Sequence, residues 1–277
     1  MYKRQIRQVA RSVRFSHTPR LIKVFLIALF LLPLVLPVNF AVIQPGEGTP
    51  LFPKVLTVDK KVATTYKPDG QIYLLSIWVS NPDAKILGAE VLTCWARADC
   101  VVFPRSVIYK RNTTSKAEEK KAKIEMEDSQ SDALLATKAL LKKEFPGVDT
   151  SKLTDRAIKV SLPNVGGPSG GLIFSLALIE LLTPEDILQG RKVAGSGTIS
   201  PTGKVGAIGG ISEKIIAAKK AGASILFAAR DNCDEIPGDV SGIAVVAVSS
   251  LEEAISFLRE PSHSSFRGLS GCTNLGA

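Results

Sequence analysis

The longest apolar run of the chain lies near its beginning. No charged residue occurs from Val24 to Gly46, and this stretch contains the segment VFLIALFLLPLVLPVNFAVI. About 20 apolar residues are enough for a helix to cross a bilayer. The pattern therefore predicts a transmembrane anchor over 24–43, preceded by a basic tail over 1–23.

A cleaved signal peptide is the alternative interpretation of this run. A signal peptide has a shorter apolar stretch and ends at a small-x-small cleavage site. Before Val42 the sequence reads Asn39-Phe40-Ala41, which matches such a site poorly. We therefore favour an uncleaved anchor.

The next part of the chain, 44–146, mixes strand and helix patterns. Residues 44–53 are rich in Gly and Pro, which predicts a linker. Residues 54–59 and 71–79 are rich in β-branched and aromatic residues, as strands are. The charged stretch 115–144 has helical apolar spacing in its second half and predicts one or two surface helices. We expect a small α+β region over 54–146.

From residue 147 the pattern alternates regularly between strands and helices, which predicts an α/β domain over 147–260. The tail over 261–277 is polar and rich in Gly and Ser, so we expect it to be flexible except where Cys272 is tied down. The expected strands cover 157–162, 193–199, 205–208, 224–228 and 243–248, and the expected helices cover 169–182, 213–221 and 251–258.

The positive charge is concentrated at one end. The formal net charge is +9, and seven basic residues with no acidic partner precede position 24, which leaves about +2 for the rest. A nucleic-acid-binding protein carries its basic patch on the folded part, so this function class is excluded. Basic residues before an apolar span predict a single-pass cell-membrane protein with a cytoplasmic N-terminus and an extracytoplasmic folded part.

All four cysteines follow the apolar run, so we expect them to face an oxidising compartment. Cys94 and Cys100 are a natural local pair, which leaves Cys233 and Cys272, although sequence alone does not fix the connectivity. The chain has no CxxC motif and no Cys/His cluster, so we expect no metal site.

The two histidines restrict the chemistry that the chain can perform. His17 lies in the basic tail and His263 in the polar C-terminal tail. Ser-His-Asp and Cys-His catalysis need a positioned imidazole, and neither residue is well placed to supply one. If the chain performs acyl transfer, lysine is the usual substitute base.

A glycine-rich loop leads directly into an apolar helix at Asn164-Val-Gly-Gly-Pro-Ser-Gly-Gly-Leu172, with Ser169 at the N-cap or first turn. One interpretation is a capped helix, since serine is a favoured N-cap. The other is a nucleophile whose alkoxide and oxyanion are stabilised by the free amides of the helix. The loop glycines would let a substrate backbone approach closely; they are Gly166, Gly167, Gly170 and Gly171.

The second motif runs from Gly195 to Lys214. It contains Thr202-Gly-Lys204, but the residue after the lysine is not Ser or Thr, so it is not a phosphate-binding loop. Gly195-x-Gly197 lacks the third glycine of a dinucleotide fingerprint. We expect no cofactor. Lys214 lies on the first turns of a helix, where most lysines are simply solvated.

Together the two motifs resemble the proteolytic domain of Lon proteases. That family carries Pro-Ser-Ala-Gly and, some forty residues later, Gly-Gly-Leu-x-Glu-Lys. Here the first motif reads Pro168-Ser169-Gly170-Gly171 and the second Gly209-Gly-Ile-Ser-Glu-Lys214, and the lysine lies 45 positions after the serine. The resemblance covers roughly residues 155–258.

Within that family the chain is similar to the exported, membrane-anchored Lon-like proteins of actinobacteria. Three departures from the family pattern matter. Gly170 replaces the usual Ala after the nucleophile. Gly166 stands where many Lon proteases carry Asp, although the exported subgroup shares this glycine. The stretch 145–155 is too short to hold the PDZ domain of that subgroup. No ATPase module is recognisable either.

The resemblance implies a serine endopeptidase that acts on exported or misfolded polypeptides. It implies Ser169 as nucleophile, Lys214 as base, Ser196 as the residue that orients the lysine, and the Gly170 amide in the oxyanion hole. It also implies a homo-hexamer. Two alternatives remain: an inactive Lon-like module that binds exported proteins, and a structural membrane protein.

Overall fold

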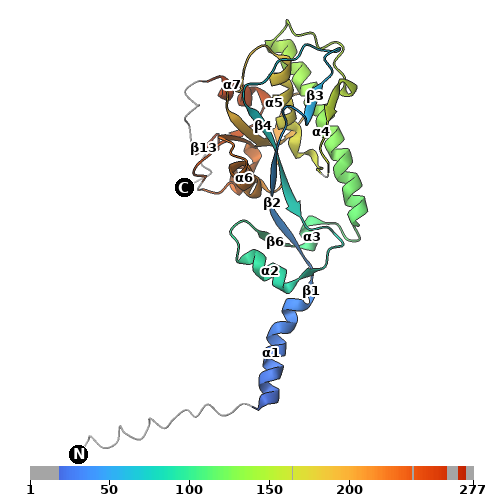
Figure 1. Cartoon of the computed structure of the whole chain (residues 1–277), viewed down its shortest axis with the longest axis vertical. Helices are drawn as coiled ribbons and strands as arrows, with labels where there is room; N and C mark the ends of the chain where they lie inside the picture. Colours follow the sequence, from blue (N-terminus) through green and yellow to red (C-terminus); the bar gives the residue numbers. More distant parts are fainter. Residues whose placement is uncertain (1–18, 164, 239, 261–267, 273–277) are drawn as a thin grey trace, which may run out of the picture.

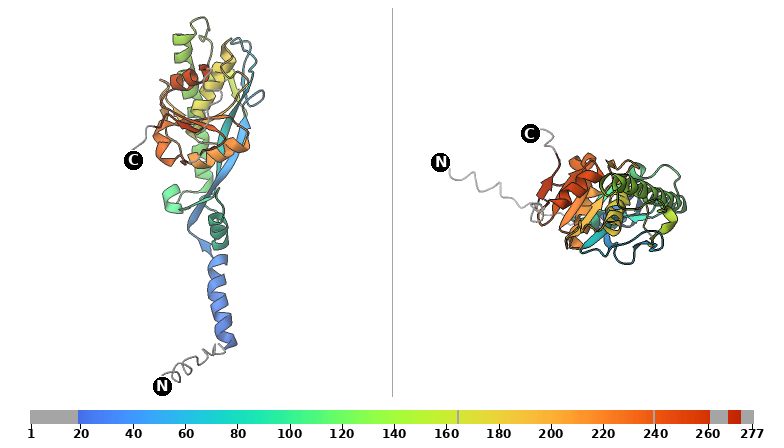
Figure 2. Two further views of the ribbon diagram at one scale, coloured as in Figure 1. Left: turned by 90° about the vertical axis from the view of Figure 1, so that its left-hand side faces the viewer. Right: turned by 90° about the horizontal axis from the view of Figure 1, so that it is seen from above.

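The fold is described from a computed structural model, which describes residues 19–163, 165–238, 240–260 and 268–272. A single helix, α1 (Arg20–Val35), projects from one end of an elongated body (Figures 1 and 2). The body is built around one large sheet with helices on both faces. The expected α/β architecture is confirmed.

The central sheet has seven strands in the order β13-β12-β11-β8-β4-β2-β6. The strands from β13 to β4 run parallel, and β2 and β6 complete the sheet in antiparallel pairing. Their bounds are β2 (Phe40–Pro50), β4 (Gln71–Val79), β6 (Val101–Pro104), β8 (Lys192–Ser196), β11 (Ile225–Ala229), β12 (Ala244–Val248) and β13 (Gly268–Ser270).

In β11 and β12 every residue is buried, which explains why these two strands are apolar throughout. In β11, Ile225 and Phe227 point to one core, while Leu226 and Ala228 point to the other. The first core is covered by α4 (Ser115–Glu144), α5 (Gly171–Leu182) and α7 (Leu251–Arg259), and the second by α6 (Ile211–Lys220).

Helix α5 is buried almost completely, because it lies between the sheet and α4. A helix that is apolar on all sides needs such a position. Helix α4 is one continuous helix with Thr114 as its N-cap, where the sequence left open one helix or two. Its second half supplies the apolar side that packs on α5.

Residues 44–50 of the expected linker over 44–53 are instead part of strand β2, and 51–53 follow that strand, which corrects the prediction. Its glycines reflect close packing: a Cβ on Gly48 would lie 2.6 Å from the Cβ of Ala221 at the end of α6. The register with β4 shifts between Pro45 and Gly48. The sheet also crosses the domain boundary expected between 146 and 147, because β8 pairs directly with β4.

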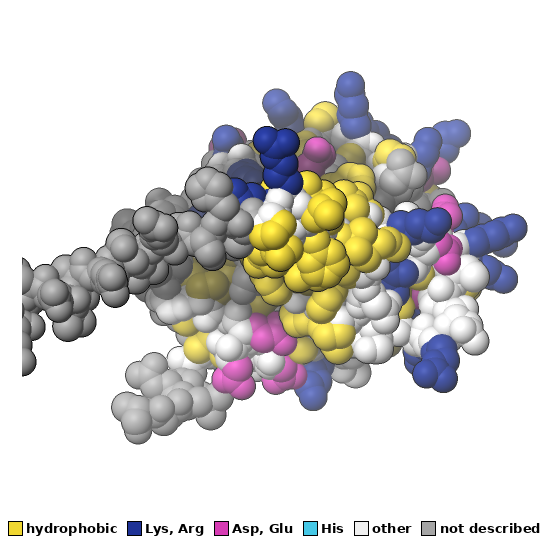
Figure 3. Space-filling model, turned by 90° about the horizontal axis from the view of Figure 1, so that it is seen from below, with side chains coloured by type: hydrophobic (Ala, Val, Ile, Leu, Met, Phe, Trp, Pro, Cys, Tyr) yellow, Lys and Arg dark blue, Asp and Glu magenta, His cyan; other side chains and the backbone are white. Residues whose placement is uncertain are grey.

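The span expected over 24–43 is helical only as far as Val35. The chain then enters β1 (Pro37–Val38) and β2, where Ala41, Val42 and Ile43 are buried in the body. Among the described residues, no helix combines the length and the apolar character needed to cross a membrane. No side chain of α1 is buried, and apolar side chains gather at this end of the molecule (Figure 3).

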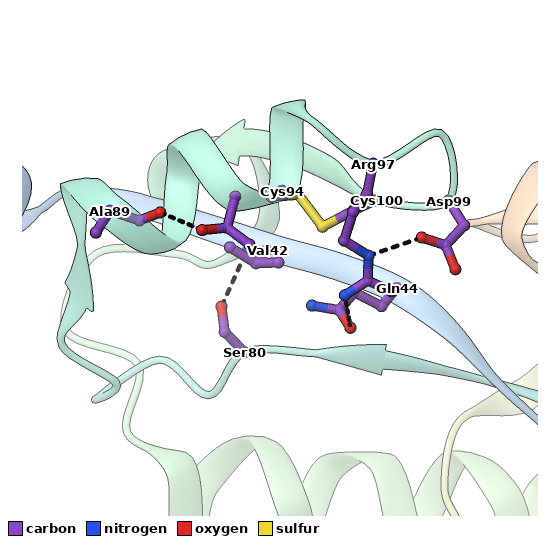
Figure 4. The surroundings of a disulfide bond; sticks show 9 residues. Val42, Gln44, Ser80, Ala89, Cys94, Arg97, Asp99 and Cys100 are labelled. Carbon is purple, nitrogen blue, oxygen red and sulfur yellow. Dashed lines mark hydrogen bonds and ion pairs between the residues drawn. A yellow bond between two sulfur atoms is a disulfide. The ribbon is translucent and has the colours of Figure 1, made fainter.

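A small lobe joins α1 to the body. It contains β1, β5 (Ile86–Leu87), α2 (Gly88–Trp95), β6 and α3 (Arg105–Ile108). The disulfide between Cys94 and Cys100 fastens the end of α2 to the start of β6 (Figure 4). Val42 of β2 packs against this disulfide in a separate small core.

The C-terminal tail is partly structured. Residues 268–270 form β13, and Cys272 is bonded to Cys233. The expected tie is therefore present, while 261–267 and 273–277 lie outside the described residues. The remaining short elements are β3 (Leu56–Val58), β7 (Ile158–Val160), β9 (Thr198–Ile199), β10 (Val205–Gly206) and the 3-10 turns η1 (Asp155–Ala157), η2 (Pro168–Gly170) and η3 (Arg230–Glu235).

Candidate active site

Ser169 and Lys214 line the same cavity, although they belong to helices on opposite faces of the sheet. This cavity has a volume of about 320 Å³, and we call it the Ser169–Lys214 cavity. The rest of its wall comes from β4, α4 and the loop before η2. The cavity lies past the end of β8, the strand between the two helices, and the carboxyl ends of parallel strands are the usual place for sites in such folds.

Ser169 occupies the 3-10 turn η2 immediately before α5. The N-cap residue of α5 is Gly170, so Ser169 is not the cap that the alternative interpretation required. The carbonyl oxygen of Ser169 accepts hydrogen bonds from the Gly197 amide at 3.0 Å and from Ser196 Oγ at 3.1 Å. These two bonds fix the turn to the end of β8 and leave the half-buried Ser169 side chain on the cavity wall.

The loop before Ser169 is held by α4. The Gly167 amide donates to the Ala122 carbonyl at 2.8 Å, and Ser129 Oγ donates to the Pro168 carbonyl at 2.9 Å. Gly167 has a φ of 92°, which only glycine adopts readily. The nucleophile candidate is thus positioned by backbone contacts on both sides.

Gly170 is more closely packed than the sequence suggested. A Cβ at this position would lie 2.8 Å from Leu74 Cδ1 and 2.8 Å from Phe174 Cε2. The alanine that the related motif carries could therefore be accommodated only if these two side chains moved.

Lys214 lies on the first turn of α6, and its side chain is only 3% exposed. Its Nζ donates to Ser196 Oγ at 3.0 Å, so the hydrogen bond expected between these two residues is present. Burial lowers the pKa of Lys214 to about 8, and the nearby Glu213 carboxylate opposes part of that shift. About a tenth of the amine is therefore uncharged at pH 7 and able to accept a proton.

Asn232 is a residue that the sequence analysis did not single out. It is 1% exposed and lies in η3, where its Oδ1 accepts from the Ile208 amide at 3.0 Å and its Nδ2 donates to the Ile208 carbonyl at 2.8 Å. The clamped loop continues through Gly209, which lines the cavity, to Gly210, the N-cap of α6. Asn232 therefore positions the start of the helix that carries Lys214.

The described residues contain no group of three or more His, Cys, Asp or Glu side chains suited to a metal ion. His17 and His263, which the sequence analysis set aside as bases, lie outside the described residues. The site brings together the hydroxyl of Ser169 and the buried amine of Lys214 on one cavity, with the hydroxyl of Ser196 bonded to that amine and to the Ser169 backbone carbonyl. Such a set is suited to nucleophilic acyl transfer.

Comparison with known proteins agrees with this chemistry. The profile of the Lon protease (S16) C-terminal proteolytic domain matches residues 120–259. Lon protease of Fusobacterium nucleatum is 34% identical over 140 residues, which cover 48% of this chain and 18% of that protein. Lon protease of Mycolicibacterium smegmatis is 33% identical over 129 residues, which cover 42% and 16%.

A mitochondrial Lon protease homolog of Caenorhabditis elegans is 35% identical over 120 residues, which cover 40% of this chain and 12% of that protein. The matched stretch thus spans less than a fifth of the length of these curated relatives. The profile match over 120–259 includes both Ser169 and Lys214, and it includes α4 from residue 120 onwards, the part that holds the loop before Ser169.

We expect Asn232→Ala to lower the free energy of unfolding by about 1–3 kcal/mol, because it leaves the buried amide and carbonyl of Ile208 without partners. Urea denaturation measures this loss. Hydrogen exchange at the Ile208 amide should accelerate at the same time. Asn81→Ala, at an exposed position, is the matched control and should change stability by less than about 0.5 kcal/mol. An equal loss of unfolding free energy in both variants would show that Asn232 does not stabilise the loop at Ile208.

Proposed function

Because the chain belongs to the family of the Lon protease (S16) C-terminal proteolytic domain, we propose that Ser169 and Lys214 are the catalytic pair of this serine peptidase. The observation that carries the proposal is the buried amine of Lys214 in the cavity that Ser169 also lines. A lysine can act as a general base only when it is uncharged, and burial supplies that condition.

In the proposed reaction, Lys214 Nζ takes the proton of Ser169 Oγ as the oxygen attacks the carbonyl carbon of a peptide bond. The tetrahedral intermediate then collapses, and the leaving amine receives the proton from Lys214. Water attacks the resulting ester and gives its proton to Lys214, and the acid product leaves as Ser169 recovers its proton. The backbone amides at the start of α5, with Gly170 first, stabilise the oxyanion.

Ser196 supports this reaction by orienting the base. Its hydroxyl accepts from Lys214 Nζ and donates to the Ser169 carbonyl, so one side chain fixes the amine relative to the serine backbone. Such prepositioning lowers the entropic cost of proton transfer.

We also propose that the chain is attached to the cell membrane through α1, with the peptidase domain outside the cytoplasm and exported or misfolded polypeptides as its substrates. Twelve large apolar side chains between Leu21 and Leu36 are exposed, and lipid would cover them.

The sixteen residues of helix α1 extend about 24 Å. Bilayers accommodate short apolar helices by thinning and by snorkelling of flanking basic side chains, here Arg20 and Lys23. The two disulfides are consistent with an oxidising compartment.

The catalytic pair is tested by casein hydrolysis with the full chain in detergent. We expect Ser169→Ala and Lys214→Ala each to lower kcat/KM by at least about a thousandfold, as losses of nucleophile or base do. Lys219→Ala, an exposed lysine on the same helix, is the control and should retain full activity. An active-site-directed acylating probe should label the wild type and Lys219→Ala only. Casein left intact and no labelling of the wild type would favour an inactive binding module instead.

The pH dependence of kcat/KM should report the titration of Lys214. The pKa of this amine is lowered to about 8, so its uncharged fraction falls about tenfold for each pH unit below that value. We expect kcat/KM to rise with pH and to level off above about pH 8. Glu213→Gln removes a charge that raises this pKa, so it should move the rise to lower pH. A profile that is flat from about pH 6 to 9 would argue against lysine as the base.

Membrane attachment is tested by extracting isolated membranes with alkaline carbonate. The wild type should stay with the membrane, whereas the double variant Phe25→Asp/Leu29→Asp should be released, because charges within α1 oppose insertion into lipid. Leu135→Asp, at an exposed apolar position of α4, is the control and should stay bound. Protease added to intact spheroplasts should digest the folded domain. Release of the wild type by carbonate would contradict the proposal.

A further inference from the structure

A second cavity continues the Ser169–Lys214 cavity along the molecule. Its volume is about 770 Å³, and the two cavities share the lining residues Ile77, Val79, Val165 and Gly166. We call it the distal cavity. Its far wall comes from residues that precede the matched proteolytic domain, among them Asn81, Pro82, Ile108 and Tyr109. The site therefore has an extension that the matched domain alone does not build.

The walls of the distal cavity are held in place by hydrogen bonds. Tyr109 donates its hydroxyl hydrogen to the Ser80 carbonyl at 2.7 Å, which joins the end of α3 to the end of β4. Asp83 accepts from the Ser115 amide at 2.7 Å, which fixes the start of α4. A preformed wall of this kind favours selective binding, because little conformational entropy is lost when a ligand enters.

One edge of β4 is available along both cavities. The Gln71 amide donates to the Arg191 carbonyl beside β8, whereas Ile72 and Ser80 bond towards β2. By strand alternation, Leu75, Ile77 and Val79 present their amides and carbonyls on the β8 side. The pairing with β8 ends at Leu74, so β2 is the one ladder partner of this stretch in the described part of the chain. An extended polypeptide can add to such an edge.

Helix α4 lines the opposite side of both cavities with one face. Met126 reaches the Ser169–Lys214 cavity, Lys123 and Ala122 come next, and Glu119 and Glu118 lie towards the far end. The seven residues from Met126 to Glu119 correspond to about 10 Å along the helix axis. An extended peptide covers that distance in about three residues. It reaches the far end of the distal cavity in about five residues.

We propose that the distal cavity binds the substrate polypeptide on one side of the cleaved bond, and selects apolar side chains near the bond and a basic side chain about three to five residues away from it. The apolar part of the cavity is formed by Ile77, Val79, Ile108, Leu162 and Val165. Two carboxylates of α4, Glu118 and Glu119, lie at its far end. Glu118 is paired with Lys121 at 3.6 Å, so Glu119 is the carboxylate that attracts a cation there. This inference rests on the proposed function, because it extends the same site.

The test uses a library of quenched-fluorescence peptides of about twelve residues, with the full-length protein in detergent at low ionic strength. Sequencing of the products should show Lys or Arg enriched at least about threefold at one position, on one side of the cut only. Glu118→Gln/Glu119→Gln should abolish that enrichment, and Glu119→Lys should replace it with a preference for Asp or Glu. Glu127→Lys, an exposed and matched change on the same helix outside both cavities, should keep the wild-type preference.

Kinetics on single peptides separate selectivity from folding. For the best library peptide, Glu118→Gln/Glu119→Gln should raise KM about threefold or more with little change in kcat. For a peptide that is too short to reach Glu119, KM and kcat of the double variant should match those of the wild type. Cleavage by the wild type without a basic preference, or equal effects of Glu119→Lys and Glu127→Lys, would overturn this inference and leave the proposed function intact. No cleavage by the wild type would overturn the proposed function itself.

Discussion

The hydrogen bond from Lys214 Nζ to Ser196 Oγ is the contact on which the arrangement of the site depends. Lys214 belongs to α6 on one face of the sheet, and Ser169 precedes α5 on the other face. The two faces meet only past the end of β8, which ends with Ser196. Because Ser196 also contacts the backbone of Ser169, the last residue of one strand links both helices.

Keeping this amine away from water costs folding stability. The pKa of Lys214 falls from 10.5 to about 8, a change that corresponds to a free-energy cost on the order of 3 kcal/mol. Because the folded pKa is the lower one, this cost applies in full below about pH 8 and disappears as the pH rises towards the unfolded value. The buried cores around β11 and β12 and the two disulfides offset it. The site thus illustrates stability given up for reactivity.

Local patterns predicted the elements of the second half of the chain well, because β11 and β12 are apolar throughout and the helices around them are periodic. They failed at residues 44–50, where Gly46 and Gly48 suggested a loop. In the structure these glycines lie within β2, because Ser76 and Ala221 leave no space for a side chain. Local sequence patterns also could not predict contacts between segments that lie far apart in the sequence. The bond from Asn232 to Ile208 and the joining of β4 to β8 depend on the complete fold.

The pair of Ser169 and Lys214 was predictable for a different reason. The resemblance of two short motifs, at their spacing, to the Lon family singled out both residues before any contact was known, and the structure places both on one cavity. The depth of the site was not predictable, because the distal cavity combines β4, α3 and α4, whose mutual positions the sequence does not indicate.

The path of the chain from α1 into the body has a mechanical consequence. Only residues 36–39 separate the last helical residue, Val35, from the start of β2. Two of them pair with β5, and the Leu36 carbonyl accepts from the Gly88 amide, so this junction has little slack. Since β2 is an integral strand of the catalytic sheet, any force or tilt imposed on α1 passes directly to the sheet. The orientation of the Ser169–Lys214 cavity is therefore coupled to the orientation of α1.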